Sequence, residues 1–96
     1  MAVLRLTRFK IDPADTEELL ARRAALVTAV RKAYPGLLHT QLAMVDDETW
    51  IDAWRWDSVA SAQAAIDNTP TIPEAAAAFA LTQGATAEFA DIVDER

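Results

Sequence analysis

The sequence predicts one α+β domain with a four-stranded antiparallel sheet. Three observations indicate this class. Stretches in which polar and apolar residues alternate, as in a strand, are separated by stretches whose apolar residues recur with helical spacing. Proline, glycine and short acidic segments mark the turns between them. The chain has 96 residues, which suffice for one hydrophobic core, so we expect residues 1–96 to form a single domain.

Charge and composition restrict the classes of function. The 15 acidic residues outnumber the 9 basic ones and no basic cluster is present, so we expect neither nucleic acid nor a membrane as a partner. The absence of cysteine excludes disulfides and thiol chemistry. Charges interrupt residues 1–10, unlike a signal peptide, and the longest apolar run, residues 75–81, is too short to cross a bilayer. We therefore expect a cytoplasmic protein.

Residues 3–11 predict the first strand, because two sets of side chains alternate along them. Asp12 and Pro13 then suit the N-cap and the first position of a helix. Acidic residues in its first turn and basic residues in its last turn match the helix dipole, and Pro35 ends the helix at Tyr34. The predicted apolar face consists of Leu20, Ala24, Val27 and Tyr34, with Leu26 and Val30 alongside.

Residues 37–45 and 49–56 predict a β-hairpin around the acidic turn at residues 46–48. Gly36 permits the turn that leads into this hairpin. Alternation in the first of the two strands predicts one face with Leu38, Leu42 and Met44 and the opposite face with His39, Gln41 and Ala43.

Two short helices and a last strand complete the chain. Ser58 predicts the N-cap of a helix that ends at Ile66. Residues 71–74 have the spacing of a capping box, which predicts a further helix that Gly84 closes. Residues 85–93 predict the fourth strand. The order β-α-β-β-α-α-β is the split βαβ, or ferredoxin-like, arrangement with its second helix in two pieces.

Both faces of the predicted sheet carry sizeable apolar side chains, although helices on one side can cover only one of them. A large exposed apolar face is unusual in a monomer. Two sheets that pack face to face across a two-fold axis cover each other. We therefore expect a homodimer whose sheets form a closed or nearly closed barrel, a dimeric α/β barrel.

Three tryptophans share one face of the third predicted strand. Trp50, Trp54 and Trp56 have the same parity as Asp52, so all four side chains point to one side. Each indole buries a large area and carries one N–H that needs an acceptor. Such a face is either part of the hydrophobic core or the wall of a pocket for a flat apolar molecule, and the sequence leaves both interpretations open.

Asp52 and His39 are the candidate proton acceptors. Asp52 lies between two indoles, where partial desolvation makes a carboxylate a stronger base, unless it forms an ion pair with Arg5 or Arg55. His39 is the single histidine and titrates near neutral pH, unless it is a plain surface or interface residue. One histidine without cysteines lacks the clustered ligands of a transition-metal site, so we expect neither a metal nor another cofactor.

Three segments carry a resemblance to a known family. They are residues 9–13 (FKIDP), residues 34–37 (YPGL) and residues 54–58 (WRWDS), each at one end of a predicted strand. Over nearly its whole length the chain resembles the antibiotic biosynthesis monooxygenase domain family. The resemblance implies a dimeric α/β barrel, as in cofactor-free quinone-forming oxygenases and heme-degrading enzymes. In that family a tryptophan closes the third strand beside the active cavity, and Trp56 stands at the matching position.

The resemblance also implies which chemistry is missing. Heme-degrading members combine that tryptophan with an asparagine on the first strand and a histidine on the later helix. The corresponding places here hold Thr7 and the alanines of residues 75–80. Many members carry a histidine in the helix after the tryptophan, where this chain has residues 62–66 (AQAAI). The resemblance therefore implies a protein without an axial ligand for heme iron.

Two functions fit these features. The first is a cofactor-independent monooxygenase-like enzyme that oxidises a planar phenolic or polyketide-type small molecule with O₂, which requires a base and a pocket that excludes water. The candidate base is Asp52 or His39. The predicted substrate-binding residues are Trp54, Trp56, Trp50, Thr7, Tyr34 and Phe79. The alternative, favoured by the missing histidines, is a non-catalytic dimeric module that binds a small hydrophobic ligand or a partner protein.

Overall fold

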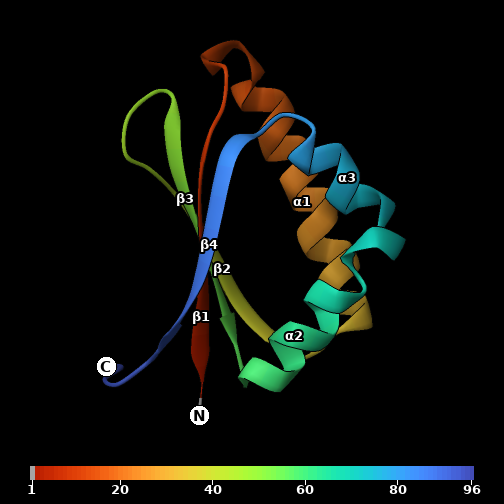
Figure 1. Cartoon of the computed structure of the whole chain (residues 1–96), viewed down its shortest axis with the longest axis vertical. Helices are drawn as coiled ribbons and strands as arrows, with labels where there is room; N and C mark the ends of the chain where they lie inside the picture. Colours follow the sequence, from red (N-terminus) through yellow and green to blue (C-terminus); the bar gives the residue numbers. More distant parts are fainter. Residues whose placement is uncertain (1) are drawn as a thin grey trace.

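The computed structural model describes residues 2–96 and has two layers, an antiparallel sheet and a set of helices on one of its faces (Figure 1). Met1, the first residue of the predicted domain, lies outside the described residues. The elements are β1 (Val3–Lys10), η1 (Pro13–Asp15), α1 (Thr16–Ala33), β2 (Leu37–Met44), β3 (Thr49–Trp56), α2 (Val59–Asp67), η2 (Thr69–Thr71), α3 (Pro73–Phe79) and β4 (Gln83–Asp91). The strand order is β2-β3-β1-β4, so the predicted ferredoxin-like α+β arrangement is confirmed.

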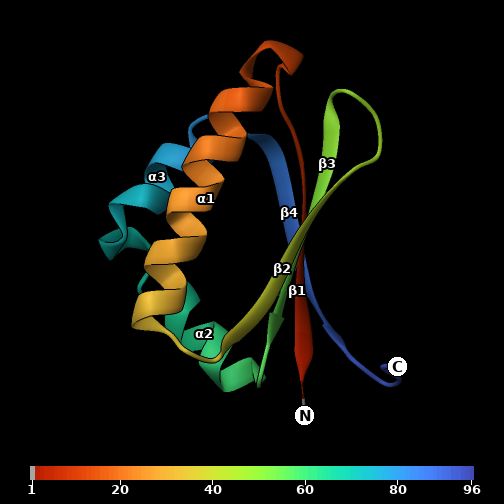
Figure 2. The same cartoon turned by 180° about the vertical axis from the view of Figure 1, so that it is seen from behind.

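β1 lies inside the sheet and its register defines both faces. Val3 stands opposite Trp56 and Phe9 opposite Trp50, so alternate residues of β1 share a face with the indoles of β3. Figures 1 and 2 show the helices on one side of the sheet. Val3, Phe9, Trp50 and Trp56 are buried, which confirms the predicted division of β1 into two faces. Within residues 2–96, no helix combines the length and apolarity needed to cross a membrane.

α1 buries only part of the apolar face that the sequence predicts: Leu26, Val27 and Val30 are buried as expected, whereas Leu20 and Ala24 are not. Its buried residues are Leu19, Leu26, Val27 and Val30. Leu20 is 47% exposed and Ala24 is exposed as well. The prediction that these two residues belong to the core is wrong. Apolar residues and alanines surround much of this helix, so periodicity alone does not show which of two neighbouring rows of side chains is buried. Tyr34 caps the helix in a non-helical conformation, as expected before Pro35.

β2 contains an irregularity that the alternation does not reveal. Leu37 stands opposite Trp56 and His39 opposite Arg55, so Leu38 is an extra residue between two pairs. Leu37 is 2% exposed and Leu38 is 47% exposed. The prediction that Leu38 shares one face with Leu42 and Met44 is wrong, because a bulge of one residue reverses the faces on its far side.

The acidic turn between β2 and β3 depends on one carboxylate. Oδ1 of Asp46 accepts the backbone N–H of Glu48 at 2.9 Å and that of Thr49 at 2.8 Å. These hydrogen bonds hold the pKa of Asp46 below its usual value, and the one from Glu48 lowers it most. The charged form of Asp46 therefore favours the turn that aligns the hairpin.

α2 begins as predicted and α3 does not. The hydroxyl of Ser58 accepts the N–H of Ser61 at 3.1 Å, which is an N-cap. Thr71 belongs instead to η2, where its hydroxyl donates to the carbonyl of Asn68 at 2.6 Å. The N-cap of α3 is Ile72, without a side-chain hydrogen bond. The predicted capping box is wrong because a nearer backbone acceptor takes the threonine hydroxyl.

Gly84 belongs to β4 and does not close α3, which ends at Phe79. The pairing of β1 with β4 shifts between Arg8 and Lys10, and Lys10 stands opposite Gln83. Gly84 adopts a φ of 61° next to this irregularity, a conformation that glycine adopts without steric cost. Gly84 therefore does mark a change in backbone conformation, but this change lies at the start of a strand and not at the end of a helix.

The face of the sheet away from the helices carries no other element (Figure 2). We call it the open face. Its centre consists of the half-buried residues Leu4, Leu6, Ile51 and Ala53. Apolar side chains therefore occupy both faces of the sheet, as predicted.

Gly36 lies where the connection from α1 to β2 passes the start of α2. A Cβ at Gly36 would lie 2.8 Å from Oδ1 of Asp57 and 2.8 Å from Cβ of Ser61. The Gly36 carbonyl also accepts the N–H of Asp57 at 2.9 Å. Gly36 does not have a positive φ, in contrast to Gly84. Glycine is required here by close approach, and not by the turn conformation expected from the sequence.

Replacing Gly36 with alanine should lower the free energy of unfolding by about 1–3 kcal/mol, because the added methyl overpacks the contact with α2. Urea unfolding measures the loss. Ser61→Gly removes two of the crowding atoms, so the double variant should lose less than the sum of the single variants. Strictly additive losses would contradict the crowding explanation.

Candidate functional site

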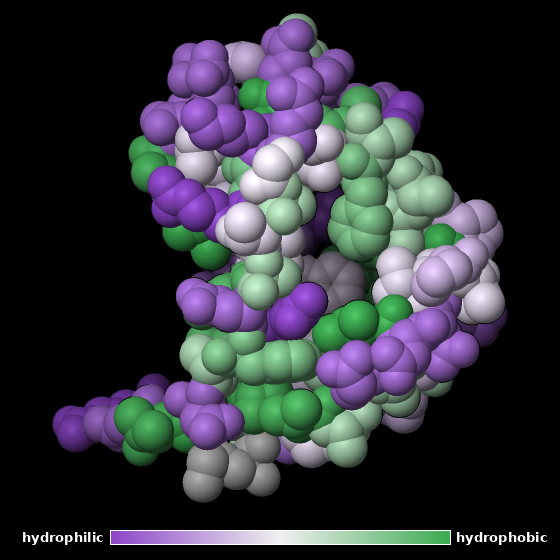
Figure 3. Space-filling view, in the orientation of Figure 1, coloured by the Kyte–Doolittle hydropathy of each residue, from purple (hydrophilic) through white to green (hydrophobic). Residues whose placement is uncertain are grey.

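A cavity of about 620 Å³ separates part of the sheet from the helices. Its walls come from β1, β3 and β4 on one side and from the three α-helices on the other. Figure 3 shows it as a hollow between β4 and α3. The volume lies within the range of roughly 300–1,000 Å³ that is usual for small-molecule sites.

Small side chains on two helices leave this space open. The residues that α2 buries are Ala62 and Ala65, and those that α3 buries are Ala75 and Ala78. A methyl group fills little of the distance between a helix and a sheet, whereas Leu26 of α1 reaches the cavity wall. These alanines thus determine where the core remains unfilled. The sequence suggested them mainly as helix formers.

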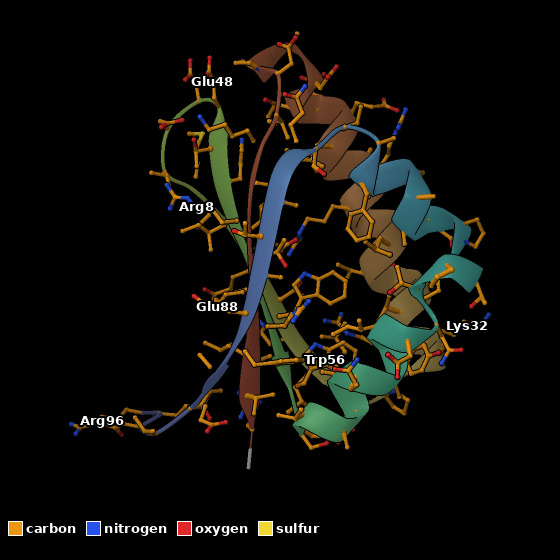
Figure 4. All side chains as sticks on the ribbon, viewed as in Figure 1. Arg8, Lys32, Glu48, Trp56, Glu88 and Arg96 are labelled. Carbon is orange, nitrogen blue, oxygen red and sulfur yellow. The ribbon has the colours of Figure 1, made fainter. Side chains whose placement is uncertain are left out.

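Two indoles form the flattest part of the wall. Trp54 and Trp56 have ring centroids 6.4 Å apart and an interplanar angle of 29°, which is an offset stack. Trp56 is 2% exposed, and Figure 4 shows it between the sheet and α2. Phe79 of α3 also lines the cavity and is 53% exposed. Both indoles line the cavity, and Trp56 also belongs to the buried core, against which Trp54 packs, so the two interpretations left open by the sequence both apply here.

Trp50 faces the same way but belongs to a different region. It packs with Phe9, Ile11 and Leu19 in a separate buried cluster and does not line the cavity. Its Nε1–H is buried without a hydrogen-bond partner. Phe9, which stands opposite Trp50 on β1, does line the cavity together with Trp56, whereas Trp50 contributes only to the buried cluster. For Trp50 the core interpretation applies.

Asp52 lines the cavity and is held by an arginine of α1. Nε of Arg23 donates to Oδ2 of Asp52 at 2.9 Å, and Nη2 donates to Oδ1 at 2.8 Å. The side chains are 17% and 13% exposed, respectively. The expected partners were Arg5 and Arg55, but Arg55 pairs with Glu95 on the open face. The sequence did not indicate Arg23 as the partner. Arg23 lies on α1 and Asp52 on β3, and these two elements come together only in the folded chain.

The ion pair leaves acceptor positions on Asp52 for a further hydrogen bond. Each carboxylate oxygen has more than one acceptor position, and Arg23 occupies one on each. Thr7 stands opposite Asp52 in the register of β1 and β3 and also lines the cavity. The structure therefore brings Thr7 and Asp52 together beside the indole wall.

Arg5 also lines the cavity, although the sequence suggested it only as an ion-pair partner of Asp52. It stands opposite Trp54 and Phe89 on the two neighbouring strands. Its guanidinium carbon lies 4.8 Å from the centre of the Phe89 ring, a cation–π contact. The alternation in β1 could have indicated this position, because it places Arg5 on the same face as the apolar residues Val3 and Phe9.

The structure does not bring His39 or Tyr34 to the cavity. His39 stands opposite Arg55 and lies on the side of the open face, where its Nε2 is 3.2 Å from Nε2 of Gln41. Tyr34 packs against the main core from the end of α1 and does not line the cavity. Predicting the face of His39 requires the register between β2 and β3, which one strand does not reveal.

The residues around the cavity do not fit heme. A heme iron takes an axial histidine, cysteine, tyrosine or methionine, and the described cavity lining contains none of these. The position that the resemblance assigns to a heme-binding histidine lies in the alanine segment of α3. We therefore derive no chemistry through a heme group.

No protein-family profile and no curated protein matches the sequence, whereas solved structures match the fold. SnoaB, a cofactor-independent oxygenase from Streptomyces nogalater, is 21% identical, with 98% of this chain and 95% of SnoaB covered and a TM-score of 0.74. The ActVA-Orf6 monooxygenase of Streptomyces coelicolor, in complex with nanaomycin D, is 18% identical, with coverages of 99% and 90% and a TM-score of 0.77. MhuD, a heme degrader of Mycobacterium tuberculosis with two hemes in its active site, is 24% identical, with coverages of 98% and 98% and a TM-score of 0.73.

These similarities extend over nearly the whole of each chain, while fewer than a quarter of the residues are identical. At this level of identity the common property is the fold, and function depends on the residues of each site. The neighbours include both a cofactor-independent oxygenase and a heme degrader, so the fold accommodates more than one chemistry. This chain has the fold of the antibiotic biosynthesis monooxygenases, as its sequence resemblance to that family predicted.

Proposed function

We propose that the protein is a cofactor-independent monooxygenase-like enzyme that oxidises a planar aromatic small molecule, of phenolic or polyketide type, with O₂. The observation that carries this proposal is the cavity of about 620 Å³ with two stacked indoles in its wall. A flat ring packs well against such a wall, and a bound ring displaces water from it. The fold shared with SnoaB, a cofactor-independent oxygenase, supports the same activity.

The chemistry needs a proton acceptor and no metal. A base removes a proton from an activated ring carbon, and the resulting carbanion transfers one electron to O₂. The two radicals combine into a carbon–oxygen bond, and the peroxide anion takes the proton back from the base. The hydroperoxide then loses water together with the second hydrogen of the same carbon. The carbon ends as a carbonyl, with one oxygen atom of O₂ in the product and the other in water. We assign proton acceptance to Asp52 because it is the carboxylate in the described cavity wall.

The proposal includes a homodimer that forms through the open face. Leu4, Leu6 and Ile51 give this face an apolar centre that a second sheet can cover. Figure 4 shows Arg8 and Glu88 pointing away from the helices on the same side, where opposite charges suit packing of two identical faces. The cavity lies on the other face, so assembly and ligand binding use different surfaces of one sheet.

One observation favours the second candidate function, a non-catalytic module that binds a small hydrophobic ligand. Both oxygens of Asp52 accept hydrogen bonds from Arg23, so the one carboxylate of the described cavity wall already has a partner within the protein. A module needs only the cavity and its indole wall. The two candidates therefore differ in whether O₂ is consumed.

Oxygen uptake by metal-free protein, with anthrone and dihydroxynaphthalenes as substrates, distinguishes these functions. We expect uptake in the wild type and at least about a tenfold lower kcat/KM in Trp54→Ala, which removes half of the indole wall. Trp50→Phe is the matched control, because Trp50 lies outside the cavity lining. Ligand binding without uptake would support the module instead. Equal uptake by Trp54→Ala would contradict the role of this wall.

Replacing Asp52 with asparagine should lower kcat by about 10²–10⁴-fold while the dissociation constant for substrate changes little, because the amide keeps the shape and loses the base. Stopped-flow oxidation and calorimetric titration measure the two quantities. Thermal unfolding should accompany them, since the variant leaves Arg23 partly uncompensated. A folded variant with unchanged kcat would remove Asp52 from the proposed chemistry.

Leu6→Asp should convert the dimer to a monomer, because it places a carboxylate at the apolar centre of the proposed interface. Sedimentation velocity measures the change. Leu20→Asp is the matched control, since Leu20 is an exposed leucine on α1, away from the open face. A monomeric wild type, or a Leu6→Asp variant that stays dimeric, would refute this interface.

A further inference from the structure

Arg5 is the one uncompensated charge in the cavity wall of the described chain. Arg5 and Asp52 are its two charged lining residues. Asp52 is neutralised by the two hydrogen bonds from Arg23. Within residues 2–96, no carboxylate forms a salt bridge with Arg5, although Arg22, Arg23, Arg55 and Arg96 all have such partners. The cavity therefore carries a local positive charge in a chain whose net charge is −6.

The hydrogen-bond donors of Arg5 also lack acceptors in the described chain. The guanidinium carbon lies over the ring of Phe89, 4.8 Å from the ring centre, and a cation–π contact supplies no lone-pair acceptor to the N–H groups. No hydrogen bond joins the Arg5 side chain to another described residue. Arg5 is half-buried among apolar neighbours that include Trp54. A cation in these surroundings is stabilised when an anionic group supplies the acceptors.

We infer that the cavity binds planar aromatic acids, with the ring against Trp54 and a carboxylate on the N–H edge of Arg5. Guanidinium and carboxylate match in a planar pair of parallel hydrogen bonds. The cation–π contact with Phe89 restricts the Arg5 side chain, so less side-chain freedom is lost when the acid binds. This inference names the substrate class of the proposed function and rests on the cavity being its binding site.

A matched pair of probes isolates the carboxylate. 2-Naphthoic acid and 2-naphthamide have the same ring system and nearly the same shape, and they differ in charge. Calorimetric titration of the wild-type protein at pH 7.5 should give at least about a tenfold lower dissociation constant for the acid, as expected for a charge-assisted pair. This comparison does not depend on the folding of any variant.

Variants assign the preference to Arg5. Arg5→Met keeps an unbranched chain without the charge, so the affinity for the acid should fall to that for the amide. Arg5→Lys keeps the charge without the planar fork and should retain part of the preference. Arg31→Met is the matched control, because it makes the same charge change at an exposed position of α1 outside the cavity lining. This control should retain the full preference.

Each outcome of these titrations tests a different part of the inference. Equal wild-type affinities for acid and amide would overturn the acid preference and leave the aromatic site intact. A preference that persists in folded Arg5→Met would overturn the role of Arg5. Binding of neither probe would overturn both this inference and the proposed ligand site. Acid preference without oxygen uptake would support Arg5 while contradicting the monooxygenase activity.

Discussion

The space between the helices and the sheet is the constraint on which the rest of this structure depends. α2 and α3 bury only alanines, so they cover the indoles of β3 without filling the volume above them. A close-packed interior would place leucine or phenylalanine at such positions. The resulting cavity brings Trp54, Asp52 and Arg5 to one shared space, so apolar, acidic and basic groups line it together.

The ion pair between Arg23 and Asp52 joins the two layers at the edge of this cavity. Its burial makes removal of either partner costly, because the remaining charge would be left without compensation. The same pair sets the electrostatics of the site, since it neutralises the acidic wall residue and leaves Arg5 as the net charge. The stability of the contact between the layers and the charge of the cavity wall are thus coupled through one interaction.

β3 serves two surfaces at once. Trp54 and Trp56 face the cavity, whereas Ile51 and Ala53 face the open side of the sheet. Arg55 also lies on the open side, where Glu95 raises its pKa by hydrogen bonding. The period of two along a strand separates the surfaces, so substitutions at neighbouring positions can report on ligand binding and on assembly independently.

The strands, the two faces of β1 and the indole face of β3 were predictable from the sequence, because alternation and turn residues act over a few positions. The bulge at Leu38 and the cap of α3 escaped prediction, since each depends on a competing backbone contact. Only the tertiary structure paired Asp52 with Arg23, separated Trp50 from the other indoles and placed His39 outside the cavity. Local patterns determine where a side chain points along its own element, whereas its partner is decided by how separate layers meet in space.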